Sequence, residues 1–99
     1  MSQVDIRLKA MAHGGRRAML RSTLAIERSA SDLARIGGLS RPAASQHLAM
    51  LLNAGLMSVR SDGRRRWYRA DAAVLDQVRH DLDAFWSGRL EELKRAAES

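Results

Sequence analysis

The sequence contains no cysteine and very few aromatic residues, namely two tryptophans, one tyrosine and one phenylalanine. The lack of cysteine excludes disulfides, thiolate metal sites, iron–sulfur clusters and cysteine nucleophiles. No uninterrupted apolar run reaches roughly 18 residues, the length of a membrane-spanning helix, so we expect no membrane partner. Residues 1–15 also lack the continuous apolar core of a secretory signal. We therefore expect a cytoplasmic protein.

Negative charge is scarce in most of the chain. Residues 1–70 carry 13 basic and 4 acidic side chains, whereas residues 71–99 carry 4 basic and 7 acidic ones. Fifteen of the 17 basic residues are arginines, whose planar guanidinium groups suit phosphates and guanine edges. The net charge of +6 and its uneven distribution indicate that one face binds a polyanion, which we expect to be nucleic acid.

The length of 99 residues fits a single domain with one modest core. All four aromatic residues lie at or after Trp67, so the earlier core must be built from aliphatic residues, methionine and alanine, which favours helices. We expect residues 1–99 to form one domain that is mainly α-helical, with five helices and a small β-hairpin.

Apolar spacing predicts three of these helices outside the centre of the chain. The first covers residues 3–12, and the second covers residues 16–24 after a break at His13-Gly14-Gly15. The last helix begins after Asp71, which we expect to cap it. Gly88 is a weak point that is expected to bend or split this last helix.

The two central helices are predicted to form a helix-turn-helix. The third helix follows Ser29, which we expect to form a capping box with Asp32, and it ends at Gly37-Gly38. Only Leu39 separates these glycines from Ser40, the expected cap of a fourth helix that runs to about residue 54. Such a short turn between two helices is typical of the helix-turn-helix motif.

The fourth helix has two chemically different sides. The apolar residues at positions 44, 48 and 51 recur on one side, which we expect to face the core. The other side carries Arg41, Ser45 and Gln46. Serine and glutamine can hydrogen-bond to base edges, and an arginine at the helix start can reach a base or a phosphate.

A β-hairpin is predicted after the helix-turn-helix. The turn Asp62-Gly63 lies between two strand-like runs, residues 56–61 and 64–69. Arginines at positions 64, 65 and 66 follow the turn directly, which is typical of a wing that contacts an adjacent groove or flanking phosphates. Trp67 and Tyr68 should point to opposite faces, so we expect one to be a core anchor and the other to be partly exposed.

The last helix carries more apolar surface than a core this small can cover. A symmetric dimer that pairs this helix with the first helix would bury that surface. The residues expected at the dimer interface are Val4, Leu8, Met11, Val78, Leu82, Phe85, Trp86, Leu90 and Leu93.

Over residues 4–95 the sequence resembles the ArsR/SmtB family of winged helix-turn-helix regulators. The resemblance is carried by residues 16–20, by residues 29–34, by the run Leu39 to Leu48 and by the wing from Gly63 to Tyr68. It implies a homodimer that binds an inverted-repeat operator in double-stranded DNA, usually as a repressor of its own operon. The first and last helices would then form the dimer interface, and the protein would be associated with the nucleoid.

From the side chains and the resemblance together, we expect DNA contacts at Arg17, Ser40, Arg41, Pro42, Ser45, Gln46, His47, Arg64, Arg65 and Arg66. Alternatives stay open for His47 and for the arginines at the start of the second helix. His47 either touches a phosphate or packs at the edge of its helix. Arg16 and Arg17 contact phosphates there, or one of the two forms a salt bridge to Glu27 or Asp32.

The sequence departs from the metal-sensing members that it resembles. The third helix has no cysteine, and the last helix has a single histidine. Asp76 and His80 share a helical face and are weak metal candidates, and the alternative is a solvated acidic face with a titratable histidine. We expect no cofactor, and the sequence shows no small-molecule or metal effector.

The sequence does not predict an enzyme. Its histidines fall on turns or helix surfaces rather than in a buried catalytic trio, and it has no phosphate-binding or dinucleotide-binding glycine motif. A sequence-specific dimeric regulator is therefore our first hypothesis. The alternative is a protein-interaction or nonspecific DNA-binding module that works through its long last helix.

Overall fold

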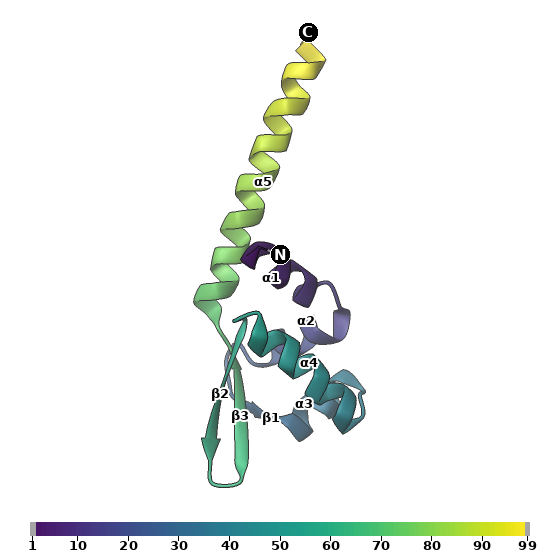
Figure 1. Ribbon diagram of the computed structural model, residues 1–99, viewed down its shortest axis with the longest axis vertical. Coiled ribbons are helices and arrows are strands. Elements are labelled where there is room, and N and C mark those ends of the chain that lie inside the picture. The colour runs from purple at the N-terminus through teal and green to yellow at the C-terminus, as the bar shows by residue number, and fades with distance from the viewer. Residues whose placement is uncertain (1, 99) are drawn as a thin grey trace.

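The first four helices lie on one side of a small sheet, and the last helix projects far beyond both. The computed structural model describes residues 2–98. Its elements in chain order are α1 (Gln3–Met11), α2 (Gly14–Ser22), β1 (Arg28–Ser29), α3 (Ala30–Gly37), α4 (Arg41–Asn53), β2 (Met57–Asp62), β3 (Arg65–Ala70) and α5 (Ala72–Glu98). Figure 1 shows α1 to α4 and the sheet gathered at one end of α5. The predicted winged helix-turn-helix fold, with five helices and a hairpin, is confirmed.

Serine side chains cap three of the helices, because their hydroxyls accept backbone N–H groups that the helix leaves unsatisfied. Ser29 accepts from the amide of Asp32 at 3.2 Å, and Ser40 accepts from the amide of Ala43 at 3.3 Å. The Asp32 carboxylate pairs with Arg35 instead of completing the expected capping box. At the end of α3, Gly38 has φ of +63°, the left-handed conformation that sets the tight turn into α4.

The second helix begins earlier than expected. Gly14 and Gly15 were predicted to form a break, but they are the first residues of α2. The His13 ring explains the difference, because its Nδ1 accepts a hydrogen bond from the amide of Gly15 at 3.0 Å and caps the helix.

The core lies where α2, α3, α4 and the sheet meet. The predicted inner side of α4 is buried, since Ala44, Leu48 and Leu51 expose no more than 1% of their surface. Met19 and Leu33 are equally buried. Alternation along β3 places Tyr68 in this core, whereas Trp67 is only partly buried, as predicted for this pair.

The sheet has three antiparallel strands in the order β1-β3-β2, rather than the two strands of the predicted hairpin. The additional strand β1 is only two residues long and pairs Arg28 with Tyr68 and Ser29 with Trp67. The hairpin turn is displaced by one residue from the prediction, since Asp62 pairs with Arg65 and the turn consists of Gly63 and Arg64. Among the described residues only glycines have a positive φ, so in this two-residue turn Gly63 has a positive φ and Arg64 does not. A positive φ at the first turn residue alone is the pattern of a type II′ turn.

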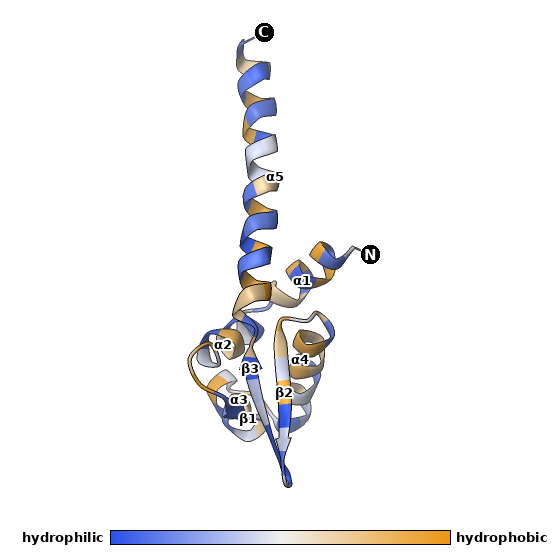
Figure 2. Ribbon diagram, turned by 90° about the vertical axis from the view of Figure 1, so that its left-hand side faces the viewer, coloured by the Kyte–Doolittle hydropathy of each residue, from blue (hydrophilic) through white to orange (hydrophobic). Residues whose placement is uncertain are grey.

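Helix α5 is continuous from Ala72 to Glu98, so the expected split at Gly88 is wrong. A single glycine costs only about 1 kcal/mol relative to alanine, too little to interrupt a helix with good helix formers on both sides. Figure 2 shows apolar segments recurring along α5 among hydrophilic ones, beyond its contact with the other elements. No helix within residues 2–98 combines the length and the apolar character that a membrane span requires.

The packing of α4 predicts which substitutions unfold the protein. Leu51→Ala should lower the free energy of unfolding by about 2–5 kcal/mol, because it leaves a cavity in a fully buried site. Met50→Ala, at the neighbouring position that is 37% exposed, should lower it by less than about 1 kcal/mol. Urea unfolding at one fixed protein concentration measures both values, and equal losses would contradict the assigned inner side of α4.

Candidate nucleic-acid interface

The outer side of α4 presents polar residues to solvent at the end of the helix near the wing. Arg41, Ser45 and Gln46 are all exposed, and so are Ser40 and Pro42 at the helix start. Burial of the inner side fixes the rotation of α4 about its axis, so these side chains must face outward. An outward polar side of this kind is the side that a recognition helix presents to base edges.

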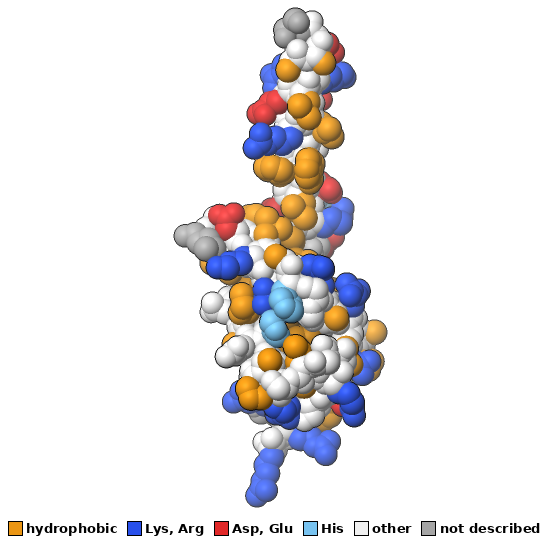
Figure 3. All heavy atoms as spheres, turned by 90° about the vertical axis from the view of Figure 1, so that its right-hand side faces the viewer, with side chains coloured by type: hydrophobic (Ala, Val, Ile, Leu, Met, Phe, Trp, Pro, Cys, Tyr) orange, Lys and Arg blue, Asp and Glu red, His pale blue; other side chains and the backbone are white. Residues whose placement is uncertain are grey.

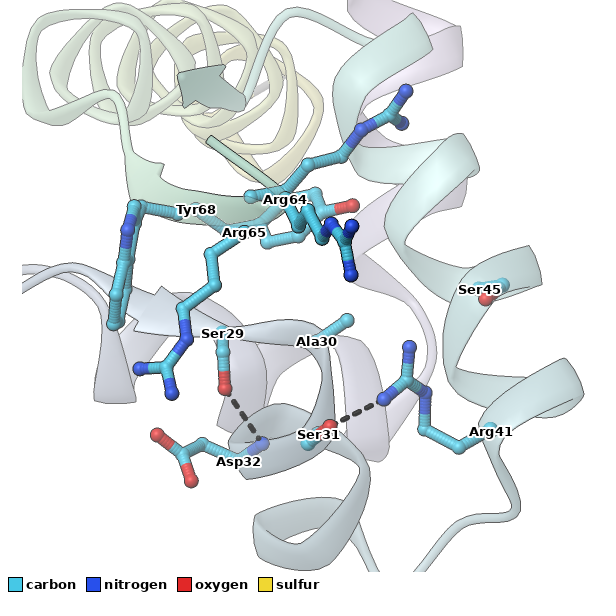
Figure 4. Close-up of a pocket in the computed structure, with 11 residues that line it drawn as sticks. Ser29, Ala30, Ser31, Asp32, Arg41, Ser45, Arg64, Arg65 and Tyr68 are labelled. Atoms are coloured by element: carbon cyan, nitrogen blue, oxygen red, sulfur yellow. Dashed lines mark hydrogen bonds between the residues drawn. The ribbon is translucent and has the colours of Figure 1, made fainter. Parts of the chain in front are cut away.

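A groove runs between this end of α4, the start of α3 and the wing. Its volume is about 610 Å³. It is lined by Ser29, Ala30, Ser31, Asp32, Arg41, Ser45, Arg64, Arg65, Arg66, Trp67 and Tyr68. Figure 4 shows Arg41 on one wall of this space and the wing with Arg64 and Arg65 on the opposite side. The structure thus brings together Arg41 and the wing arginines, which are more than twenty positions apart in the sequence.

The groove is strongly positive. Four arginines line it, and within residues 2–98 none of these four takes part in an ion pair. The only carboxylate in the lining, that of Asp32, is paired with Arg35. Arg41 is oriented by a hydrogen bond from its guanidinium to the hydroxyl of Ser31. Unpaired guanidinium groups gathered in one groove favour the binding of a polyanion such as the DNA backbone.

The wing arginines differ in their surroundings. Arg64 lies in the turn, whereas Arg65 shares a face of β3 with Trp67 and Arg66 shares the other face with Tyr68. The Arg65 guanidinium lies 6.0 Å from the centre of a Trp67 ring, a cation–π contact. An ion pair of 2.6 Å between Arg60 and Glu27 links the hairpin to the segment before β1. The wing is thereby tied to the α3 side of the groove.

Sequence reasoning missed the wall of the groove that the start of α3 supplies. Ser31 and Asp32 line the groove, and Ser31 holds Arg41, yet neither was expected at the interface. The helix-turn-helix motif could have indicated that the start of α3 contributes to the interface, because the first helix of such a pair lies across the DNA backbone. Trp67 also lines the groove, and its indole N–H is buried without a hydrogen-bond partner in the described part of the chain.

The two arginines at the start of α2 have separate environments. Arg17 is exposed, lies outside the groove lining and donates to the backbone oxygen of Met11 at 2.8 Å. Arg16 is only 8% exposed and bonds to backbone oxygens and to His47. The alternative that one of them pairs with Glu27 or Asp32 is wrong, because these carboxylates pair with Arg60 and Arg35.

His47 lies beside Gln46 on α4 and is partly buried. Its ring centre is 4.4 Å from that of His13, and its Nδ1 is 3.0 Å from the guanidinium of Arg16. Figure 3 shows a histidine patch at the surface of the globular part. Burial is the main cause that lowers the pKa of His47 below its usual 6.5, and repulsion by His13 and Arg16 adds to it.

The weak metal candidates on α5 lie close together but form no larger cluster. The Nδ1 atom of His80 is 2.9 Å from the backbone oxygen of Asp76 and 3.4 Å from its carboxylate. Asp76 also pairs with Arg79 at 2.9 Å. Residues 2–98 contain no group of three or more His, Cys, Asp or Glu side chains that could hold a metal ion.

The lowered pKa of His47 makes stability depend on pH. The unfolded chain takes up this proton first, so the free energy of unfolding should be constant above about pH 6.5 and fall as the pH drops below that value. Urea unfolding between about pH 7.5 and 5.5 measures this dependence. His47→Asn should reduce the slope, and equal slopes in wild type and His47→Asn would refute the assignment.

Comparison with known proteins identifies the family. The family model for bacterial regulatory proteins of the arsR family matches residues 14–59. The chain is 42% identical over 82 residues to the HTH-type transcriptional regulator Rv2034 of Mycobacterium tuberculosis, with 83% of this chain and 77% of that protein covered. It is 30% identical over 76 residues to the arsenical resistance operon repressor of Staphylococcus aureus, with 77% of this chain and 73% of that protein covered.

A solved structure with the same fold is the homodimeric winged helix-turn-helix DNA-binding domain Mb0332 of Mycobacterium bovis. Its TM-score is 0.70 and its identity is 28%, with 91% of this chain and 83% of that chain covered. The family and the two relatives are transcriptional regulators and not enzymes. The chain belongs to the arsR family of bacterial regulatory proteins, which are winged helix-turn-helix DNA-binding transcriptional regulators.

Proposed function

We propose that residues 1–99 form a single-domain, homodimeric repressor that binds an inverted-repeat operator in double-stranded DNA. The observation that carries this proposal is the shared groove, where the polar side of α4 and the wing arginines meet over an excess of positive charge. In the proposed complex α4 enters the major groove, with Arg41, Ser45 and Gln46 toward base edges. The wing arginines then contact flanking phosphates or the adjacent minor groove.

The other residues expected to contact DNA have different places in the proposed complex. Ser40 and Pro42 adjoin Arg41 at the exposed start of α4, where helix N-termini meet phosphates. Arg17 is exposed on α2 and is proposed as a more peripheral phosphate contact. For His47 the contacts with Arg16 and His13 favour the packing role over direct contact with a phosphate.

The proposed homodimer depends on α1 and α5. Phe85, Trp86, Leu90 and Leu93 expose between 51% and 67% of their surface, and Val4 exposes 36%. Figure 3 shows apolar side chains following α5 along its projecting part. Val78 is only 3% exposed and belongs to the core of its own chain, so we remove it from the proposed interface. Leu8, Met11 and Leu82 are partly buried against the same core and would form the edge of the interface.

The proposal of repression rests on the relatives. The Staphylococcus aureus relative is named as an operon repressor, and the Mycobacterium bovis structure is described as homodimeric. A two-fold symmetric pair of recognition helices fits an inverted repeat, because the symmetry of the protein and of the operator then coincide. We propose that the operator lies upstream of the protein's own gene, and that the regulator acts on the nucleoid in the cytoplasm.

Binding to this upstream DNA tests the proposed contacts. Fluorescence anisotropy should show the upstream duplex bound about 1000-fold or more tightly than a scrambled duplex at equal salt. Gln46→Ala should weaken binding to the upstream duplex by about 1–3 kcal/mol and leave the scrambled duplex nearly unaffected. Arg64→Ala should weaken binding to both duplexes and lower the salt slope by about one.

The matched control for these two variants is Arg95→Ala, which removes an arginine from the last turn of α5. It should change neither the preference for the upstream duplex nor the salt slope. If Gln46→Ala and Arg64→Ala instead act alike on both duplexes, the protein is a nonspecific DNA-binding module and the proposal of a sequence-specific repressor fails.

The oligomeric state tests the proposed interface. Light scattering after size exclusion should give twice the chain mass of 11.0 kDa for the wild type. Leu90→Glu places a charge in the apolar stripe of α5 and should shift the protein to the monomer. Ala84→Glu adds the same charge on the opposite side of α5 by helical spacing and should stay dimeric. Dimers of equal strength in both variants would contradict this interface.

A further inference from the structure

Arg16 is a buried cation without a carboxylate partner. Arg16 exposes only 8% of its surface, and no ion pair within residues 2–98 includes it. Its Nε donates to the backbone oxygen of Ala10 at 2.6 Å, and Nη2 donates to that of Lys9 at 3.2 Å. Its Nη1 donates to Nδ1 of His47 at 3.0 Å. A buried charge is costly unless its donors are satisfied, and here neutral acceptors bind three of the five guanidinium N–H groups.

Two of these acceptors belong to the end of α1. The last carbonyl groups of a helix have no partner within the helix and carry the negative end of its dipole. The guanidinium of Arg16, at the third residue of α2, therefore caps α1 and fixes α1 against α2. The third acceptor belongs to α4, so a single side chain connects three helices.

The contact with α4 lies next to the residues that are proposed to read DNA. His47 directly follows Gln46 and lies two residues after Ser45. The His13 ring packs against the His47 ring at 4.4 Å between centres, and the same His13 caps α2 through its Nδ1. A rotation or shift of α4 would separate His47 from Arg16 and from His13 together.

We propose that Arg16 is a positioning residue for DNA recognition. Through its hydrogen bond to His47 it fixes the position of the recognition helix α4 relative to the end of the dimerising helix α1. The inference rests on the proposed function in that α4 reads the operator. It goes further in assigning a role to a side chain that is buried and does not touch DNA. The same contact also connects the proposed dimer interface with the proposed DNA surface.

The contact requires a neutral His47. A guanidinium only donates hydrogen bonds, so Nδ1 of His47 must accept and the imidazole proton must sit on Nε2. Protonation of the ring removes this acceptor and adds a cation beside Arg16 and His13, the charged and titratable groups that face it from α2 and its cap. Acid therefore breaks the contact, and the position of α4 becomes sensitive to pH.

The first experiment measures the ratio of affinities for the upstream and scrambled duplexes, because added charge alone changes both affinities together. At about pH 7.5, Arg16→Lys and His47→Leu should each lower the ratio at least about tenfold, the loss expected for one buried charge-assisted hydrogen bond. His47→Asn retains a neutral acceptor and should stay within about twofold of the wild type. The double variant Arg16→Lys/His47→Leu should lose no more than either single variant.

The pH profile separates positioning from a general structural role. Between about pH 7.5 and 5.5 the ratio should fall in the wild type and in His80→Gln, the matched histidine control, but not in His47→Asn. Additive losses in the double variant, an unchanged ratio in Arg16→Lys or an unchanged pH profile in His47→Asn would each overturn the proposal.

A second experiment tests the role of Arg16 on the free protein, without DNA. Nitrogen-15 shifts of the His47 ring should show an unprotonated Nδ1, and amide hydrogen exchange in α4 should accelerate in Arg16→Lys and His47→Leu while α3 keeps its protection. If the wild type does not discriminate between the duplexes, the proposed function fails but these two measurements still test the role of Arg16. Unchanged protection of α4 in His47→Leu would overturn that role, even if Arg16→Lys does not fold.

Discussion

Burial of one side of α4 is the constraint on which the rest of the structure depends. Ala44, Leu48 and Leu51 lie in the core with almost no exposed surface, and a helix has no freedom to rotate once such a row of side chains is packed. The outward direction of Arg41, Ser45 and Gln46 is thus a consequence of apolar packing rather than of any contact that these residues make themselves. A core built almost entirely from aliphatic side chains, methionine and alanine suffices for this purpose.

The groove depends in turn on contacts between distant parts of the chain. The two-residue strand β1 pairs with the middle of β3, and Glu27 pairs with Arg60 on β2, so the hairpin and the start of α3 are held side by side. Without these contacts the wing would be an isolated two-stranded hairpin, which is marginally stable in water. The walls of the groove therefore keep their spacing although its arginines repel one another.

The sequence alone predicted the features that follow from local patterns. The five helices, the turn at Gly37-Gly38 and the hairpin depend on caps, glycines and apolar spacing, which act over a few residues. Strand β1 and the role of Ser31 in the groove were not predicted, because both depend on contacts with residues farther along the chain. The bonding of Arg16 escaped prediction for the same reason, since a charged residue at a helix start is usually exposed and its acceptors lie on two other helices.

The two tryptophans of the chain lie on different proposed surfaces, and this gives the protein two separate optical reporters. Trp67 lines the groove beside Arg65, whereas Trp86 is 58% exposed on the projecting part of α5. Intrinsic emission from Trp67 would respond to an occupied groove, and emission from Trp86 would respond to the covering of the apolar stripe. Replacing either indole by phenylalanine would separate the two signals, so docking on DNA and self-association become resolvable in one unlabelled molecule.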